Sequence, residues 1–249
     1  MVQQLPTRLG KTPLMDAIFE MRLASSVPLS QIMSGILFSQ LGCTNIEKLP
    51  HADLPEFIRN SEPNLKYIAL SRIDWDGYAI HVGDNSIGLT CGHPYRGWRE
   101  FFPRIKLLLE KLQDLPFITS IERYSLKYID VFPFPEFSLT SENFNINIGV
   151  ASKQLNFNST HLRTDLNDED AIHIIQVFGE ATGTNEKLGE TKHGVLMDID
   201  SIIDCEGLSL QLLMPELEEK LNTLHTKHKN LFFSLLTPIG LEKLEPHYE

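Results

Sequence analysis

Two aspartates separated by one residue are the clearest candidates for chemistry in this sequence. Asp198 and Asp200 lie in the run Met-Asp-Ile-Asp at 197–200, and alternate side chains of a β-strand share one face. Carboxylates paired in this way bind a divalent cation, and such cations clamp the triphosphate in nucleotidyl transfer. Those enzymes also need a Gly-Ser phosphate turn on the preceding helix, and we find none. Metal-dependent phosphoryl or nucleotidyl transfer is therefore the alternative hypothesis, and we favour a strand with an acidic outer face.

The nine histidines give no clear metal site. His225 and His228 lie three residues apart, a spacing that can place two ligands on one helical face, but the sequence contains no H-E-x-x-H. His228 also falls on an apolar helical stripe, which favours a core histidine. No nucleophile elbow, P-loop or dinucleotide fingerprint occurs. We predict no catalytic residues and no cofactor, apart from the divalent cation of the alternative hypothesis.

A second candidate site precedes a predicted helix. The segment Gly92–Trp98 joins a strand to the N-terminus of that helix, where free backbone N–H groups favour an anion. Arg96 can add positive charge and Trp98 a stacking face. The simpler interpretation is an aromatic staple that fixes how the helix enters the sheet.

The third candidate is the polar face of the first strand. In the predicted strand 14–23, Glu20 and Arg22 point away from the apolar side chains. Lys127, on a later predicted strand, is expected near them. Such a face is usually solvated or salt-bridged, and the alternative is that it lines a binding groove.

These residues must be positioned by an α+β fold of antiparallel sheets and amphipathic helices. Short turns such as Asp76-Gly77 join three strands into a meander, because parallel crossovers need longer connections. The predicted strands are 14–23, 65–74, 78–82, 86–91, 119–132, 155–166, 171–179 and 194–205, and the predicted helices are 28–41, 97–113 and 215–236.

The order of these elements suggests two similar halves. Residues 1–114 and 115–249 each contain a long strand, a three-stranded meander and a helix, and the helix at 28–41 is inserted in the first half. We interpret this order as a degenerate internal duplication. It rests on element order and not on residue identity.

Composition limits the classes of partner. The formal net charge is −11, from 33 acidic and 22 basic residues, so binding to a nucleic-acid backbone is disfavoured. The three cysteines are far apart and form no C-x-x-C motif, which suits a reducing cytosol. We recognise neither a signal peptide nor an apolar run long enough to span a bilayer. The sequence predicts a soluble, cytoplasmic protein that does not enter a membrane.

The first strand also carries a family resemblance. The run Pro13–Arg22 (PLMDAIFEMR) resembles the signature P-L-x-E-A-[IV]-F-E-[IL]-R of a sporadically distributed bacterial family of uncharacterised proteins. Leu126–Asp130 is similar to the family's Leu-Arg-Tyr-Ile-Asn run, and 197–200 to its Leu-Asp-Ile-Asp run. Asp16, Lys127 and Asp130 depart from the family's usual Glu, Arg and Asn. If these positions form a shared site, the site in this protein is altered.

The resemblance implies no activity, because the family has none established. Its patchy distribution is similar to that of bacterial conflict genes, such as anti-phage defence and toxin–antitoxin modules. The leading hypothesis is therefore a non-enzymatic binding or regulatory protein with a protein partner or self-association. A further alternative is a peptide-binding module similar to SecB-type export chaperones, an analogy of fold only.

Overall fold

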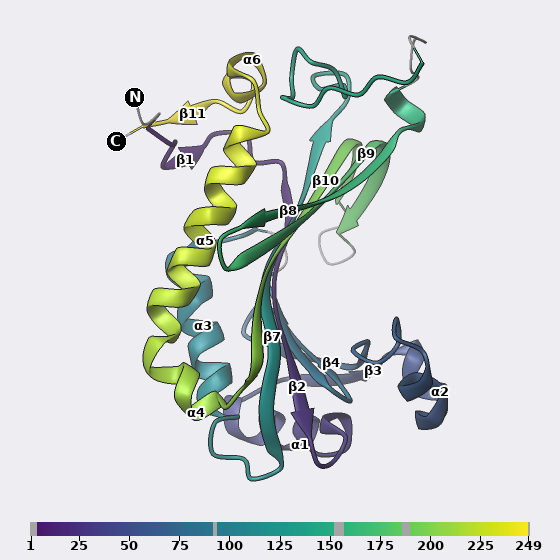
Figure 1. The fold of residues 1–249 in the computed structure, drawn as a ribbon, viewed down its shortest axis with the longest axis vertical. Coiled ribbons are helices and arrows are strands. Elements are labelled where there is room, and N and C mark those ends of the chain that lie inside the picture. Colours follow the sequence, from purple (N-terminus) through teal and green to yellow (C-terminus); the bar gives the residue numbers. More distant parts are fainter. Residues whose placement is uncertain (1–3, 92–93, 152–156, 186–189, 249) are drawn as a thin grey trace. The chain divides into compact units, whose positions relative to one another are not determined.

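The computed structural model describes residues 4–91, 94–151, 157–185 and 190–248 (Figure 1). It confirms an α+β fold with a large antiparallel sheet. No helix among these residues is both long and apolar enough to cross a membrane.

Among the described residues, nine strands form the main sheet. Their hydrogen-bonded order is β3 (Asn45–Lys48), β4 (Ala69–Trp75), β5 (Tyr78–Gly83), β6 (Ser86–Thr90), β2 (Leu14–Ser25), β7 (Ile118–Pro133), β10 (Glu190–Leu208), β9 (Ala171–Asn185) and β8 (His161–Asp168). A separate two-stranded sheet pairs β1 (Arg8–Leu9) with β11 (Pro246–His247).

In the described parts of the chain, three longer helices and several short ones accompany the strands. The long helices are α1 (Leu29–Leu41), α3 (Trp98–Glu110) and α5 (Leu217–Ser234). The short elements are α2 (Glu56–Ser61), α4 (Leu210–Leu213), α6 (Pro238–Glu242) and the 3-10 turns η1 (Pro50–Asp53), η2 (Phe157–Ser159) and η3 (Met214–Glu216). Gly42 ends α1 in the left-handed conformation, with φ of 66°, because a residue without a Cβ adopts that conformation without steric cost. The predicted end of this helix, at residue 41, is confirmed.

The chain divides into two compact units. Unit 1 contains residues 1–16, 128–201 and 222–249, and unit 2 contains residues 17–127 and 202–221. The strands β2, β7 and β10 contribute residues to both units. The predicted halves, 1–114 and 115–249, are a different division of the chain, and the duplication stays a prediction. The strand order has the form that a duplication would leave, since β4-β5-β6-β2 is followed by β7-β10-β9-β8.

The core of unit 2 lies on one face of its strands. On β2 the side chains of Phe19, Met21 and Leu23 are fully buried, whereas the alternate residues Glu20 and Arg22 remain partly exposed. This alternation is what a strand with one buried face requires. The helices α1 and α3 supply buried residues to the same core: Leu29, Met33 and Leu37 from α1, and Phe101, Ile105, Leu108 and Leu109 from α3.

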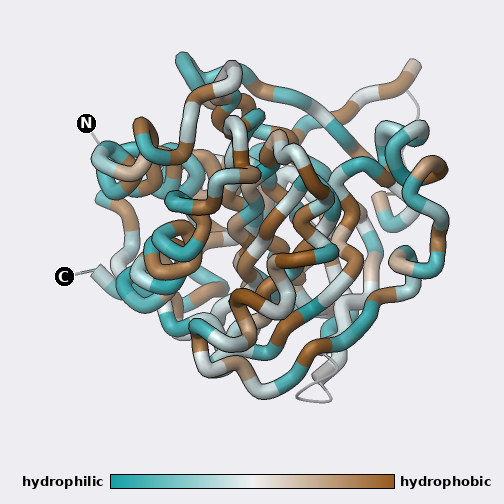
Figure 2. Tube along the Cα trace, turned by 90° about the horizontal axis from the view of Figure 1, so that it is seen from below, coloured by the Kyte–Doolittle hydropathy of each residue, from teal (hydrophilic) through white to brown (hydrophobic). Residues whose placement is uncertain are grey.

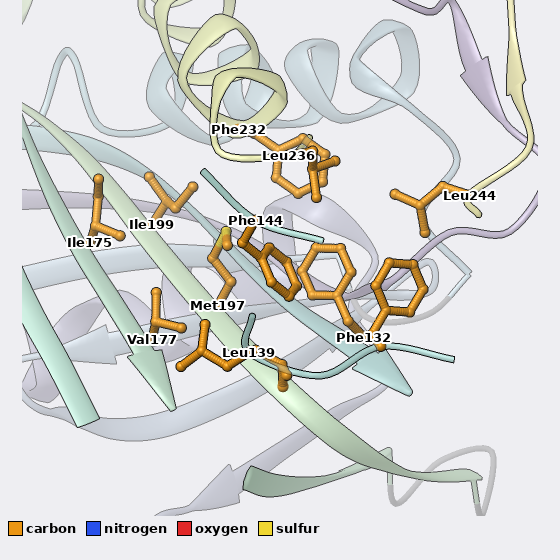
Figure 3. Packing of buried hydrophobic residues seen from close by; sticks show 12 residues of the cluster. Phe132, Leu139, Phe144, Ile175, Val177, Met197, Ile199, Phe232, Leu236 and Leu244 are labelled. Atoms are coloured by element: carbon orange, nitrogen blue, oxygen red, sulfur yellow. The ribbon is translucent and has the colours of Figure 1, made fainter. Parts of the chain in front are cut away.

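The core of unit 1 is rich in aromatic residues. Phe132 of β7 packs against Phe144 with ring centroids 5.1 Å apart and against Phe232 of α5 with centroids 6.3 Å apart. Figure 3 shows these rings beside Met197 and Ile199 of β10. Edge-to-face and stacked pairs of this kind add to the stabilisation from burial. Through this core, α5 is fixed against the strands of unit 1.

Two glycines at predicted strand ends, Gly179 and Gly194, lie inside longer strands. The strands β9 and β10 extend to Asn185 and from Glu190, beyond the predicted boundaries at Gly179 and Gly194. A Cβ on Gly179 would collide with the carbonyl oxygen of Phe157, and one on Gly194 with that of Phe132. These glycines therefore permit close backbone approach and do not mark turns. Figure 2 shows hydrophobic and hydrophilic residues interspersed along the chain.

Candidate functional site: the polar face of unit 2

The registers of five strands bring a row of polar residues together in unit 2. Glu47 of β3 lies opposite Arg72 of β4, and Arg72 lies opposite His81 of β5. His81 and Glu20 of β2 lie opposite the same residue of β6, Gly88. Because directly opposite residues project from the same face of a sheet, these side chains form one row.

The neighbouring row points to the other face and is apolar. Ile73 lies opposite Ile80, Ile80 opposite Leu89, and Leu89 opposite Phe19, and all four side chains are fully buried. On that face Phe101 of α3 stacks on Tyr78, with ring centroids 6.2 Å apart. The polar row therefore lies on the face away from α3. We call this surface the polar face, and it comprises Glu20, Arg22, Glu47, Arg72, Asp74, His81, Thr90 and Arg123.

Glu20 is held by two arginines on the polar face. Its Oε1 lies 2.9 Å from Nε of Arg22 and 3.3 Å from Nη2 of Arg123 on β7. The side chains of Glu20, Arg22 and Arg123 are 32%, 27% and 19% exposed. At this partial burial, charge-assisted hydrogen bonds are stronger than surface ion pairs. The three side chains are therefore fixed before any partner arrives.

The segment before β4 adds an aromatic ring to this cluster. The guanidinium carbon of Arg22 lies 4.1 Å from the ring centroid of Tyr67, and the ammonium of Lys66 lies 4.7 Å from it. The hydroxyl of Tyr67 donates to Glu122 of β7, whose other carboxylate oxygen lies 3.3 Å from Lys66. Cation–π contacts and ion pairs thus hold this segment next to Arg22.

The middle of the polar row, between Arg72 and Gly88, contains a neutral histidine. Burial, reinforced by the positive charge of Arg72, lowers the pKa of His81 to about 4, and Asp74 opposes this shift only in part. Nε2 of His81 lies 3.1 Å from Oγ1 of Thr90. At neutral pH, His81 is therefore a hydrogen-bonding group and not a cation.

Two arginines of the polar face have further capacity to donate. Among the described residues, the Nε groups of Arg72 and Arg123 are buried and have no hydrogen-bond partner. Buried donors normally find an acceptor, so these two are exceptions, and each is enclosed by the protein.

The sequence identified part of this surface. Glu20 and Arg22 lie together on it as expected, but the β7 cation that pairs with Glu20 is Arg123, which the sequence interpretation missed. Lys127 is four residues further along β7 and partly exposed. Arg123 could have been found from its spacing, because it lies four residues from Lys127 on the same predicted strand. Residues an even number apart on a strand share a face.

Arg96 and Trp98 lie elsewhere in unit 2. Arg96 forms an exposed ion pair with Glu100, at 3.7 Å. The ring of Trp98 packs against Phe101 and Phe102 at centroid distances of 6.3 and 5.7 Å. Both contacts lie within α3, so they do not test whether Trp98 fixes how the helix enters the sheet. Gly92 and His93, the first residues of the predicted anion site, lie outside the described residues.

Asp198 and Asp200 lie in unit 1 on β10. The described residues contain no group of three or more His, Cys, Asp or Glu side chains placed to hold a metal ion. Asp198 instead acts on a buried acid of β7: burial raises the pKa of Asp130 to about 7, Lys192 opposes the shift, and the charge of Asp198 adds to it. Asp130 is therefore half protonated near neutral pH.

A buried hydrogen-bonded chain links two histidines in unit 1. Oγ of Ser201 lies 2.8 Å from Nδ1 of His173 and 2.8 Å from Nδ1 of His228. The ring of Tyr128 packs on His228, with centroids 4.4 Å apart. Burial lowers the pKa of both histidines, and that of His228 to about 3. The expectation that His228 is a core histidine is confirmed, since its side chain is 4% exposed.

The comparisons with known proteins assign neither a family nor a function to the chain. No protein-family model matches the chain, and no curated protein matches its sequence.

Proposed function

We propose that this protein is a non-enzymatic binding or regulatory protein and that the polar face of unit 2 is its partner-binding surface. The observation that carries the proposal is the arrangement of Glu20, Arg22 and Arg123, three half-buried charged groups fixed on the face away from α3. Fixed side chains lose little further conformational entropy when a partner binds.

The mixed charges of the polar face favour a protein partner. Arg22, Arg72 and Arg123 alternate with Glu20 and Asp74 across the strands. An alternating pattern selects a partner surface of complementary pattern and rejects others through like-charge contacts. A polyanion such as a nucleic acid would meet the carboxylates as well as the arginines.

The pairing within the polar face favours binding over catalysis. Its carboxylate Glu20 is already held by two guanidinium groups, which donate hydrogen bonds and accept none. His81 stays neutral because the pKa of its ring is lowered to about 4. General acid–base chemistry needs a group whose pKa lies near the working pH, and the pKa of His81 does not.

The biological setting of the proposal rests on the family resemblance of the first strand. The strand that carries the signature, β2, is also the strand that places Glu20 and Arg22 on the polar face. We therefore place the binding surface in a bacterial conflict module, as a regulatory or sensor component of anti-phage defence or of a toxin–antitoxin pair.

Co-purification from a native host tests the proposal. The wild-type protein is compared with the variant Arg22→Ala/Arg123→Ala, which removes two cations from the polar face. The matched control is Arg99→Ala/Lys106→Ala, which removes two exposed cations from α3. We expect a protein partner that is recovered with the wild type and the control and is lost with the polar-face variant. Equal recovery with all three proteins, or no partner during phage challenge, would contradict the proposal.

A further inference from the structure

The strand β8 ends the main sheet in unit 1. It pairs with β9 along its whole length, from His161 opposite Phe178 to Asp168 opposite Ala171. On its other side no strand pairs with it among the described residues. Six of its eight residues are exposed, and the exposed set includes the apolar residue Leu166, at 42%. An edge strand of this length can pair with a further strand unless its sequence prevents it.

The backbone groups that face outward from β8 follow from its pairing with β9. The N–H of Gly179 donates to the carbonyl of Thr160 at 2.9 Å, so the backbone of Thr160 faces β9. In an antiparallel ladder, alternate residues direct both their N–H and C=O to the same side. The backbone N–H and C=O groups therefore also face β9 at Leu162, Thr164 and Leu166. The outward residues are His161, Arg163, Asp165 and Asn167.

A second copy could pair with β8 as an antiparallel strand related by a twofold axis. The outward residues of one β8 must then lie opposite outward residues of the other, because only these have backbone groups available for hydrogen bonds between the two strands. Three central registers satisfy this condition, with the twofold axis at Arg163, Thr164 or Asp165. An axis at Arg163 places two arginines opposite each other, and an axis at Asp165 places two aspartates opposite each other. Like charges directly opposite are destabilising. Only the axis at Thr164 places Arg163 opposite Asp165 of the second copy.

The register centred on Thr164 also pairs apolar side chains with apolar side chains on the other face of β8. It places Leu162 opposite Leu166 of the second copy, twice by symmetry, so the exposed side chain of Leu166 gains an apolar neighbour. Within one chain, Nη1 of Arg163 lies 3.1 Å from Oδ1 of Asp165, which shows that both charges project from the same face. In the pair of strands these two residues and their symmetry mates form four alternating charges.

We propose that the occupant of this edge is a second copy of the chain, bound through β8 in an isologous twofold dimer with the axis at Thr164. The four outward residues of each β8 pair with those of the other copy, His161 with Asn167 and Arg163 with Asp165. The two sheets then form one continuous antiparallel sheet. A surface that is complementary to itself in one register is the requirement for a closed dimer.

A charge-swap series measured by analytical ultracentrifugation tests the dimer. Arg163→Glu places acids opposite acids, and Asp165→Arg places bases opposite bases. We expect each single variant to weaken dimerisation about tenfold or more, because two unfavourable pairs form per dimer. The double variant Arg163→Glu/Asp165→Arg restores opposite charges, and we expect it to restore the dimer. The control Lys220→Glu breaks an exposed ion pair with Glu216 and leaves dimerisation unchanged.

A cysteine at the axis tests the register separately. Residues at a non-hydrogen-bonded antiparallel pair have Cα atoms about 4.5 Å apart, within the range for a disulfide. We expect Thr164→Cys to form a disulfide-linked dimer on mild oxidation, whereas Thr226→Cys on α5 and the wild type do not. A monomeric wild type at high micromolar concentration would overturn the proposal. So would single charge variants that dimerise as well as the wild type, or a Thr164→Cys variant that does not cross-link.

Discussion

Arg123 and Glu20 are 103 residues apart in the chain, and Nη2 of Arg123 lies 3.3 Å from Oε1 of Glu20. Arg22, two residues from Glu20, contacts the same oxygen. One carboxylate thus contacts two half-buried guanidinium groups on the polar face and balances the charge of one of them. Removal of the carboxylate would leave two like charges close together.

Glu20→Gln is expected to destabilise unit 2 by about 1 to 2 kcal/mol, because it removes the charge that both arginines require. The measurement is the free energy of unfolding in urea. Glu100→Gln is the control, since Glu100 and Arg96 form an exposed pair with side chains 56% and 64% exposed, and such a pair contributes little. Equal losses for the two variants would show that the arginines do not depend on Glu20.

Asp130→Asn is expected to stabilise the protein at neutral and higher pH. Burial raises the pKa of Asp130 from 3.8 to about 7, so its contribution is fully present below pH 3.8 and is lost as pH rises to about 7. Asparagine has the same shape and cannot ionise. We expect the variant to gain roughly 2 to 4 kcal/mol over the wild type at pH 8 and nearly nothing at pH 4. Thermal unfolding at both pH values measures this difference, and a pH-independent difference would contradict the assignment.

His228→Asn is expected to reduce the sensitivity of unit 1 to acid. Burial lowers the pKa of His228 from 6.5 to about 3, so its contribution is fully present above pH 6.5 and is lost as pH falls toward 3. Asparagine can replace the hydrogen bond to Ser201 without binding a proton. The variant should therefore lose less unfolding free energy than the wild type between pH 7 and pH 4. The control His51→Asn changes an exposed histidine, and a matching effect there would argue against His228 as the cause.

Arg59→Ala is expected to cost about 3 kcal/mol, the largest loss among these variants. Nη2 and Nε of Arg59 lie 2.7 and 2.9 Å from Oδ2 of Asp84, and both side chains are 10% exposed or less. The substitution would leave the charge of Asp84 buried. Lys48→Ala removes an exposed partner of Asp53 and should cost almost nothing. Similar unfolding midpoints for the two variants would contradict this distinction.

Local patterns in the sequence were sufficient to predict eight strands of the main sheet and the three long helices, but not the short strands β1, β3 and β11. The alternation in β2 and the turn residues at Asp76-Gly77 give the direction of each side chain and the antiparallel meander. The same logic was wrong at Gly179 and Gly194, because the requirement for glycine there comes from the backbone of other segments. A single sequence does not contain that information in any local pattern.

The candidate site was predictable only along one strand. Glu20 and Arg22 are neighbours in sequence, so their shared face could be inferred. The row from Arg72 through His81 to Gly88 depends on the register between strands, which turn lengths and burial set together. The chain from His173 through Ser201 to His228 likewise needs α5 to be packed on the strands of unit 1.

The most direct test of the polar face as a binding surface is site-specific photo-crosslinking in the native host. A photoreactive residue is placed at Glu47, the exposed end of the polar row, and in a second protein at Lys106 on α3. We predict a discrete crosslinked protein adduct from position 47 that disappears when Arg22→Ala/Arg123→Ala is introduced, and no such adduct from position 106. Adducts of equal yield at both positions, or an adduct at 47 that persists without the two arginines, would contradict the proposal.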